Sequence, residues 1–221
     1  MTEVHGDKVI LKDGTVHNDF DYLILSTGSS YNLKFIQITK LDKVVSPYIV
    51  DCTSSKSLIT SSKKILLAHD ILIIGAGAVG IEVATELIHK YPSKKFTIIA
   101  SGKILERCCK DAHKYCLKFL SKYSNVKLRT GEKVKEVIGN EVITTEGYKI
   151  KTDLIYYAIG FQPNTSIIKI PDSLEKKFIK VNESLQVNRY RNIFCGGDIA
   201  NISEEKLAQN AGKFNLYFLK F

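Results

Sequence analysis

The segment Asp70–Glu82, with the sequence DILIIGAGAVGIE, constrains the fold of this chain more than any other segment. Uncharged aliphatic residues at 71–74 precede three glycines in the spacing GxGxxG, and apolar residues then recur at helical spacing. This order predicts a strand buried on both faces, a tight turn and a helix. Gly75 would form the turn, Gly77 would let the backbone approach a pyrophosphate, and Gly80 would let the helix pack closely on the strand. The segment predicts a dinucleotide site, and a glycine turn without a ligand is the less favoured alternative.

The residues after the next predicted strand, 96–100, are where such a site binds the adenosine ribose. An Asp or Glu there binds the ribose hydroxyls of NAD, whereas a basic residue accepts the 2′-phosphate of NADP. Here Ala100 is followed by Ser101, Gly102 and Lys103, so the carboxylate is absent from this position. Ser101 and Lys103 are candidates to bind NADP, with ordinary surface positions as an equally weighted alternative. The missing carboxylate predicts that NADPH binds at least comparably to NADH.

Short apolar runs at 9–11 and 20–25 open the chain and flank the tetrapeptide KDGT at 12–15. Its Asp-Gly pair is typical of a tight hairpin turn, so the two runs are expected to form the limbs of a hairpin. The second limb is followed by small residues, 26–29, that leave room for a ligand. Residues 31 to about 50 show little periodicity and are expected to be mostly loop.

Hydrophobic periodicity and turn residues predict the remaining elements. Helices are expected at 54–68, 78–91, 110–123 and 204–221, and strands at 96–100, 126–128, 153–159 and 193–195. Three further strands, at 134–138, 141–145 and 148–151, are separated by turn residues and should form a small antiparallel β-meander. The elements from 70 to 128 alternate between strand and helix, which predicts an α/β fold with a Rossmann-like sheet.

The formal net charge of +9 comes from lysines scattered along the 221 residues, and no basic run is interleaved with aromatic residues. Specific nucleic-acid binding is therefore not expected, whereas weak attraction to anionic lipid leaves peripheral membrane association open. No apolar run reaches about 20 residues, and the first residues lack the features of a signal peptide, so a cytoplasmic protein is expected. Five cysteines without a CxxC pair fit a reducing compartment.

Cys109, His113 and Cys116 fall at i, i+4 and i+7 of a predicted helix and would share one of its faces. Three such side chains could bind zinc, but the sequence offers no clear fourth ligand, and such a face more often packs against a sheet. No metal site is therefore expected.

Four motifs follow one another along the chain: Ser26-Thr27-Gly28, the glycine segment at 75–82, AIGFQPN at 158–164 and RNIFCGGD at 191–198. Their order and spacing resemble those of the two-dinucleotide FAD/NAD(P) oxidoreductases, a pyridine nucleotide oxidoreductase family. The chain is most similar to the apoptosis-inducing-factor-like branch, including its ferroptosis-suppressor type. The resemblance runs from about Gly6 to the end of the chain.

The resemblance implies which residues contact the two cofactors. For NAD(P)H, it implies pyrophosphate contacts at Gly75, Gly77 and Gly80, a position near the nicotinamide for Glu82, and closure of the site by Gly160. For FAD, it implies the edge of the flavin site for Thr27 and Gly28, the ribityl or pyrophosphate portion for Asp198, and the isoalloxazine for Lys206. A helix cap is the alternative for Asp198, and a solvated side chain is the alternative for Lys206.

The same resemblance implies an NAD(P)-binding Rossmann-like domain at 69–157, inserted between two pieces of a FAD-binding domain at 1–68 and 158–221. Relatives begin with a strand and an earlier GxGxxG that holds the ADP half of FAD, and this sequence has a single GxGxxG. The FAD-binding domain is therefore expected to be incomplete, and the chain to be truncated.

The implied activity is that of an NAD(P)H-dependent flavin oxidoreductase. A hydride would pass from NAD(P)H to FAD, and electrons would pass on to a small quinone-like acceptor, with no catalytic side chain. A catalytically inactive NAD(P)-binding protein with a regulatory or binding role is the alternative from another functional class.

Overall fold

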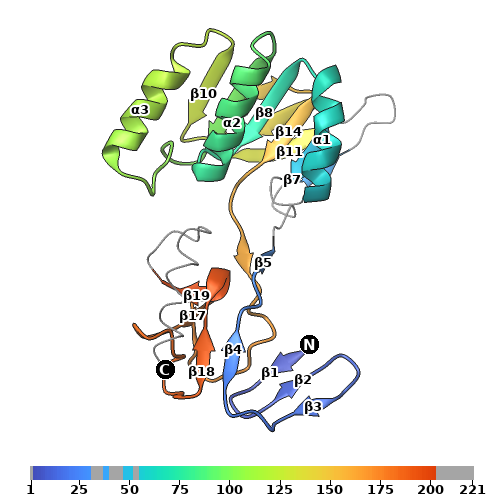
Figure 1. Ribbon diagram of the computed structural model, residues 1–221. Helices are drawn as coiled ribbons and strands as arrows, with labels where there is room; N and C mark the ends of the chain where they lie inside the picture. Colours follow the sequence, from blue (N-terminus) through green and yellow to red (C-terminus); the bar gives the residue numbers. More distant parts are fainter. Residues whose placement is uncertain (1, 31–36, 40–46, 52–54, 203–221) are drawn as a thin grey trace. The chain divides into compact units, whose positions relative to one another are not determined.

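The computed structural model describes residues 2–30, 37–39, 47–51 and 55–202 (Figure 1). The chain forms two compact units, of which unit 1 comprises residues 1–30 and 161–221 and unit 2 comprises residues 31–160. Within the described residues, no helix is both long enough and apolar enough to cross a bilayer.

Unit 2 is built on a five-stranded parallel sheet with the order β10-β9-β8-β14-β7 (Figure 1). Its strands are β7 (Tyr48–Asp51), β8 (Asp70–Ile74), β9 (Lys95–Ala100), β10 (Val126–Thr130) and β14 (Leu154–Tyr157). Its helices are α1 (Ser55–Leu67), α2 (Ala78–Lys90) and α3 (Lys110–Leu120). All neighbouring strands are parallel, and α2 and α3 join β8, β9 and β10 in sequence order. The predicted Rossmann-like α/β fold is confirmed.

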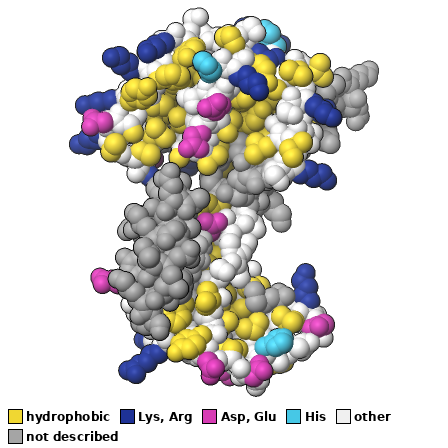
Figure 2. All heavy atoms as spheres, in the orientation of Figure 1, with side chains coloured by type: hydrophobic (Ala, Val, Ile, Leu, Met, Phe, Trp, Pro, Cys, Tyr) yellow, Lys and Arg dark blue, Asp and Glu magenta, His cyan; other side chains and the backbone are white. Residues whose placement is uncertain are grey.

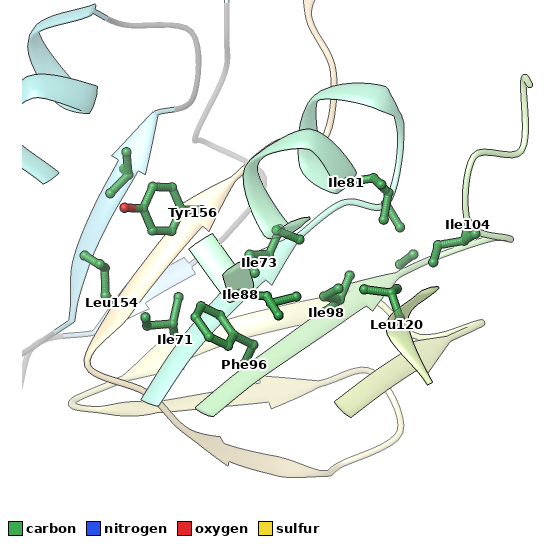
Figure 3. Packing of buried hydrophobic residues seen from close by; sticks show 14 of the residues in the cluster. Ile71, Ile73, Ile81, Ile88, Phe96, Ile98, Ile104, Leu120, Leu154 and Tyr156 are labelled. Carbon is green, nitrogen blue, oxygen red and sulfur yellow. The ribbon is translucent and has the colours of Figure 1, made fainter. Parts of the chain in front are cut away.

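The aliphatic run before the glycines is buried on both faces of the sheet, as predicted. Ile71 and Ile73 pack with Ile88 of α2 (Figure 3). Leu72 and Ile74 belong to a separate cluster, because successive residues of a strand point to opposite faces. That cluster includes side chains of the predicted antiparallel meander, which consists of β11 (Val134–Ile138), β12 (Glu141–Thr144) and β13 (Lys149–Lys151).

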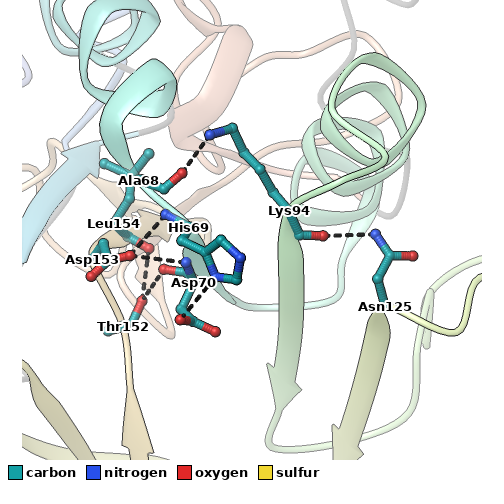
Figure 4. Close-up of polar contacts among 8 residues, drawn as sticks. All are labelled: Ala68, His69, Asp70, Lys94, Asn125, Thr152, Asp153 and Leu154. Carbon is teal, nitrogen blue, oxygen red and sulfur yellow. Dashed lines mark hydrogen bonds and ion pairs between the residues drawn. The ribbon is translucent and has the colours of Figure 1, made fainter.

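Polar contacts fix the starts of four strands at the edge of the sheet away from the glycines (Figure 4). The Asp153 carboxylate accepts hydrogen bonds from the backbone N–H groups of His69 and Asp70, at 2.8 and 2.9 Å. Asn125 Nδ2 donates to the carbonyl oxygen of Lys94 at 2.7 Å. The Asp153 contacts join the start of β14 to the start of β8, and the Asn125 contact joins the start of β10 to the start of β9. Both sets of contacts therefore stabilise the register of the parallel strands.

The expectation of a loop over 31–50 is wrong for part of its described residues. Gln37–Thr39 forms β6, which pairs parallel to β11, and Tyr48–Asp51 forms β7, which pairs parallel to β14. Both partners lie far along the chain, and strands this short leave no detectable local periodicity. The helix expected at 110–123 ends at Leu120, because the N–H groups of Lys122 and Tyr123 donate to carbonyls three residues earlier in place of four.

Unit 1 consists of short strands. Their bounds are β1 (Glu3–Val4), β2 (Val9–Ile10), β3 (Val16–His17), β4 (Leu23–Leu25), β5 (Ser29–Ser30), β15 (Gln162–Pro163), β16 (Leu174–Glu175), β17 (Phe178–Lys180), β18 (Ile193–Cys195) and β19 (Ala200–Asn201). A single turn of 3-10 helix, η2 (Gly197–Ile199), lies between β18 and β19. The buried core of the unit includes Val4, Leu25, Ile179 and Ile193.

The opening hairpin differs from the one expected. The turn lies at Asp13 and Gly14 as predicted, but the return limb is Val16–His17, which pairs with β2. The run expected to be that limb contributes Leu23–Leu25 to β4, which pairs parallel to β18. Local turn chemistry located the turn, but it could not locate a parallel partner at the other end of the sequence.

The boundaries of the compact units also differ from the divisions expected at 68/69 and 157/158. The units divide the chain at 30/31 and 160/161. The first boundary differs because β7 precedes residue 69 and yet completes the sheet of unit 2. The assignment of the three predicted segments to cofactor-binding domains stays a prediction.

Candidate dinucleotide site and flavin motifs

Gly75 and Gly80 lie where β8, α2 and the end of β14 approach one another. Gly75 has a φ of +105°, which L side chains rarely adopt, and a Cβ there would collide with the carbonyl oxygen of Ala158. A Cβ on Gly80 would collide with the carbonyl oxygen of Gly75. Both glycines are therefore required by the packing of unit 2 itself, with or without a ligand.

Gly77 is different, because no packing contact requires a glycine there. Its φ is −74°, and an added Cβ would meet no atom within 4 Å. Gly77 is the N-cap of α2, and the first turn of this helix has no side-chain cap and no acidic residue. The first N–H groups of a helix lack partners within the helix and carry partial positive charge. The open space and these N–H groups together can receive a phosphate.

This loop lies at the point where the strand order reverses. From β8, the sheet continues to β9 and β10 on one side and to β14 and β7 on the other. In open parallel sheets, ligands bind outside the carboxyl ends of the strands at such a point. Gly160, just beyond β14, is exposed with a φ of +92°, and Glu82 is exposed on α2. The structure thus brings the end of β14 and the glycine loop to the same edge of one sheet.

Ser101 and Lys103 follow the carboxyl end of β9, and both are exposed. The Gly75 N–H donates to the Ile99 carbonyl at 2.8 Å, so the strand that leads to these two residues ends beside the glycine loop. The structure also places a carboxylate near these residues, which the sequence did not indicate. It belongs to Glu106, whose carboxyl group lies against Gly102. Glu106 comes well after the strand end, and only the path of the loop brings it back.

The two predicted flavin motifs meet at one edge of unit 1. β4 and β18 are parallel neighbours, so the residues after their carboxyl ends lie side by side. The Gly196 N–H donates to the Leu25 carbonyl at 3.0 Å, and Ser29 Oγ donates to Asp198 Oδ2 at 2.6 Å. Asp198 lies inside η2, whose N-cap residue is Gly196. Asp198 is therefore not the N-cap of η2, and its carboxylate is held by the loop that contains Thr27 and Gly28.

Asn164, at the end of the AIGFQPN motif, fixes that loop. Its N–H donates to the Gly28 carbonyl at 2.9 Å, and its Nδ2 donates to the Thr27 carbonyl at 3.0 Å. Its carbonyl accepts from Thr27 Oγ1 and its Oδ1 accepts from Ser30 Oγ, both at 2.7 Å. The sequence shows the motif but no role for Asn164, because hydrogen bonds between such distant residues leave no spacing signal.

Lys206 and the three candidate zinc ligands are the other residues that the sequence singled out. Lys206 and the helix expected at 204–221 lie outside the described residues. Cys116 is buried, and burial raises the pKa of its thiol, whereas Cys109 is exposed. His113 Nδ1 lies 2.8 Å from the Ile104 carbonyl oxygen. No group of three His, Cys, Asp or Glu side chains that could hold a metal ion occurs in the part of the chain that the structure describes.

The chain is similar to known proteins over nearly its whole length. The family described as pyridine nucleotide-disulphide oxidoreductase matches residues 2–213. Apoptosis-inducing factor homolog A of Dictyostelium discoideum is 31% identical over an alignment that covers 96% of this chain and 56% of that protein. Ferroptosis suppressor protein 1 of Mus musculus is 30% identical, with 93% and 57% covered. The chain thus spans about half the length of these curated relatives.

Solved structures share the fold. The water-forming NADH oxidase of Lactobacillus brevis, in a structure bound to NADH, has a TM-score of 0.73 at 21% sequence identity. The match covers 93% of this chain and 47% of that one.

Proposed function

Because the chain belongs to the pyridine nucleotide-disulphide oxidoreductase family, we propose that it functions as an NAD(P)H-dependent flavin oxidoreductase. In this proposal a hydride passes from NAD(P)H to FAD, and electrons pass on to a quinone-like acceptor. The name of a curated relative, a FAD-dependent oxidoreductase of Flammulina velutipes, supports this class of activity.

The observation that carries the proposal is the glycine loop at the carboxyl end of β8. The open space beside Gly77 and the uncapped first turn of α2 fit the pyrophosphate of NAD(P)H. Gly75 and Gly80 would hold the loop in the required shape, because neither position accepts a Cβ. Gly160 would close the site and Glu82 would lie near the nicotinamide, while Ser101 and Lys103 would contact the adenosine ribose.

The residues of unit 1 fit part of the flavin. When bound, FAD would accept the hydride and pass the electrons on. An added Cβ at Gly28 or Gly197 would meet no atom within 4 Å, so a ligand has access to the backbone there. Asp198 would bind the ribityl or pyrophosphate portion in the position that Ser29 fixes, with Thr27 at the edge of the site. Lys206 would lie near the isoalloxazine.

A cytoplasmic protein that associates with a membrane surface is the second part of the proposal. Helix α1 exposes Ile59, Leu66 and Leu67 by 70%, 65% and 87%, and it contains three lysines and no acidic residue. Lysines interspersed with exposed apolar side chains suit an anionic lipid surface. On the face drawn in Figure 2, the Lys and Arg side chains of unit 2 are spread around it and form no single stripe. This distribution favours weak attraction to lipid over specific nucleic-acid binding.

Two measurements test the proposal. Calorimetric titration with NADH and NADPH tests the dinucleotide site. Reduction of a soluble quinone by NADH, with FAD and the N-terminal FAD-binding half of a relative added, tests the activity. Binding together with flavin-dependent reduction would support an oxidoreductase. Binding of NAD(P)H without reduction under any flavin condition would instead indicate a dinucleotide-binding protein without activity.

A further inference from the structure

The loop between β9 and α3 is held firmly beside the glycine loop. Ile104 is completely buried, and the Leu105 N–H donates to the carbonyl oxygen of Ala76, inside the glycine motif, at 2.8 Å. Leu105 has a φ of +48°, which is uncommon for a side chain of this size, and the Cys108 N–H donates to its carbonyl at 2.8 Å. Such a conformation persists only where the surrounding contacts determine it, so the loop fixes the backbone position from which the Glu106 side chain extends.

Glu106 returns toward the end of β9. The three heavy atoms closest to a Cβ built on Gly102 all belong to the Glu106 carboxyl group, and its Oε2 would collide with that Cβ. Gly102 has no side chain and therefore leaves this space to the carboxylate. The carboxylate lies beside the residues after β9, which is where a Rossmann-like site binds the adenosine ribose.

We infer that Glu106 makes this site prefer NADH over NADPH. The inference rests on the proposed dinucleotide site and adds the cofactor that the site selects. A carboxylate accepts hydrogen bonds from the 2′- and 3′-hydroxyls of the NADH ribose. The 2′-phosphate of NADPH would meet the same carboxylate as a like charge and would be repelled. Lys103 lies in the same loop and is exposed, and an ion pair between a solvent-exposed lysine and a phosphate contributes little binding energy.

The inference thus opposes the expectation from sequence that NADPH binds at least comparably. That expectation considered only the positions directly after the strand, where Ala100 and Ser101 replace the carboxylate. In the structure, Glu106, four residues after Gly102, places a carboxylate where a side chain of Gly102 would lie.

Calorimetric titration of the 221-residue chain with NADH and NADPH tests the inference, and it needs no flavin or turnover. Wild type should bind NADH at least about tenfold more tightly than NADPH. Glu106→Gln, which keeps the shape and removes the charge, should reduce this preference to about threefold or less, mainly by strengthening NADPH binding. Gly102→Ala should act in the same direction, because the added methyl group displaces the carboxylate. Glu86→Gln, which also removes an exposed carboxylate but on α2, is the matched control and should leave the preference unchanged.

The possible failures can be told apart. Two results would overturn the role of Glu106 and still support the dinucleotide site. One is equal affinity of wild type for both dinucleotides, and the other is an NADH preference that Glu106→Gln does not change. A wild-type chain that binds neither dinucleotide would overturn the proposed site itself, and the inference with it.

Discussion

Asn164 and Thr27 hold each other by two reciprocal hydrogen bonds. Thr27 Oγ1 donates to the Asn164 carbonyl at 2.7 Å, and Asn164 Nδ2 donates to the Thr27 carbonyl at 3.0 Å. The two residues belong to different sequence motifs, and each lies beside a strand of only two residues. These side-chain hydrogen bonds therefore hold the loop where two-residue strands alone provide few backbone hydrogen bonds. The same loop contains Ser29, which donates to the Asp198 carboxylate and so orients it.

Replacing Asn164 by Ala should loosen this loop. The change removes two side-chain hydrogen bonds, to the Thr27 carbonyl and from Ser30 Oγ, and it should cost about 1–3 kcal/mol of local stability. Hydrogen exchange measured on peptides that cover residues 23–30 should accelerate accordingly. Asn188→Ala, an exposed change in the same unit, is the control. Unchanged exchange in the Asn164 variant would show that the backbone hydrogen bonds alone hold the loop.

Replacing Gly77 by Val should weaken dinucleotide binding without unfolding unit 2. The side chain would enter space that is open in the free protein and that the proposed pyrophosphate would occupy. The affinity for NADH should fall at least about tenfold, which is about 1.4 kcal/mol. Calorimetry measures the loss, and Ser93→Val, on the exposed turn before β9, is the control. An unchanged affinity would contradict the assignment of the loop.

Substitution by Ala should cost more stability at Gly80 than at Gly77. Ala at position 80 gains about 1 kcal/mol of helix propensity but collides with the Gly75 carbonyl, so a net loss of about 1–3 kcal/mol is expected. Ala at position 77 should cost less than about 1 kcal/mol, because it only weakens the N-cap. Urea unfolding of the two variants provides the comparison, and equal stabilities would refute the packing argument.

Much of unit 2 could be predicted from sequence, because its signals are local. The run at 71–74, the three glycines and the helical spacing after them correspond to β8, the turn and α2. The strands β6 and β7 and the partner of β4 could not be predicted, because each of these strands pairs with a parallel partner far along the chain. The residues of a short segment do not indicate which distant strand it will pair with.

The same distinction applies to the sites. Gly75 and Gly80 could be assigned structural roles from their spacing, because the turn geometry is intrinsic to the motif. Glu106 and Asn164 could not be assigned a role, since their positions depend on how a loop returns or how two motifs meet. For the same reason, a missing carboxylate at one sequence position did not exclude a carboxylate at that place in the fold.

Thiol reactivity should separate the cysteines of α3 and its preceding turn. Cys108 and Cys109 are exposed, whereas Cys116 is buried and burial raises the pKa of its thiol. At a given pH, Cys116 therefore has a smaller thiolate fraction, and its reactivity should rise only at higher pH than that of an ordinary thiol. Mass spectrometry after iodoacetamide treatment at pH 8 should show Cys108 and Cys109 modified first, and all three modified in urea. Equal native rates would contradict the burial of Cys116.

The 221-residue chain, prepared alone, should retain less than about a tenth of an equivalent of FAD. A FAD site of this fold class needs a glycine-rich turn for the ADP half, and the single GxGxxG of this sequence belongs to β8 and α2 in unit 2. In the proposed site, Thr27 and Gly28 would lie at the edge of the flavin and Asp198 would contact the ribityl or pyrophosphate portion, so none of the three would hold the adenine. A visible spectrum of the purified chain measures the bound flavin. Addition of the N-terminal FAD-binding half of a relative should raise the occupancy, and Asp198→Ala should prevent that rise. Stoichiometric FAD in the unaided chain would show that unit 1 suffices for the whole cofactor.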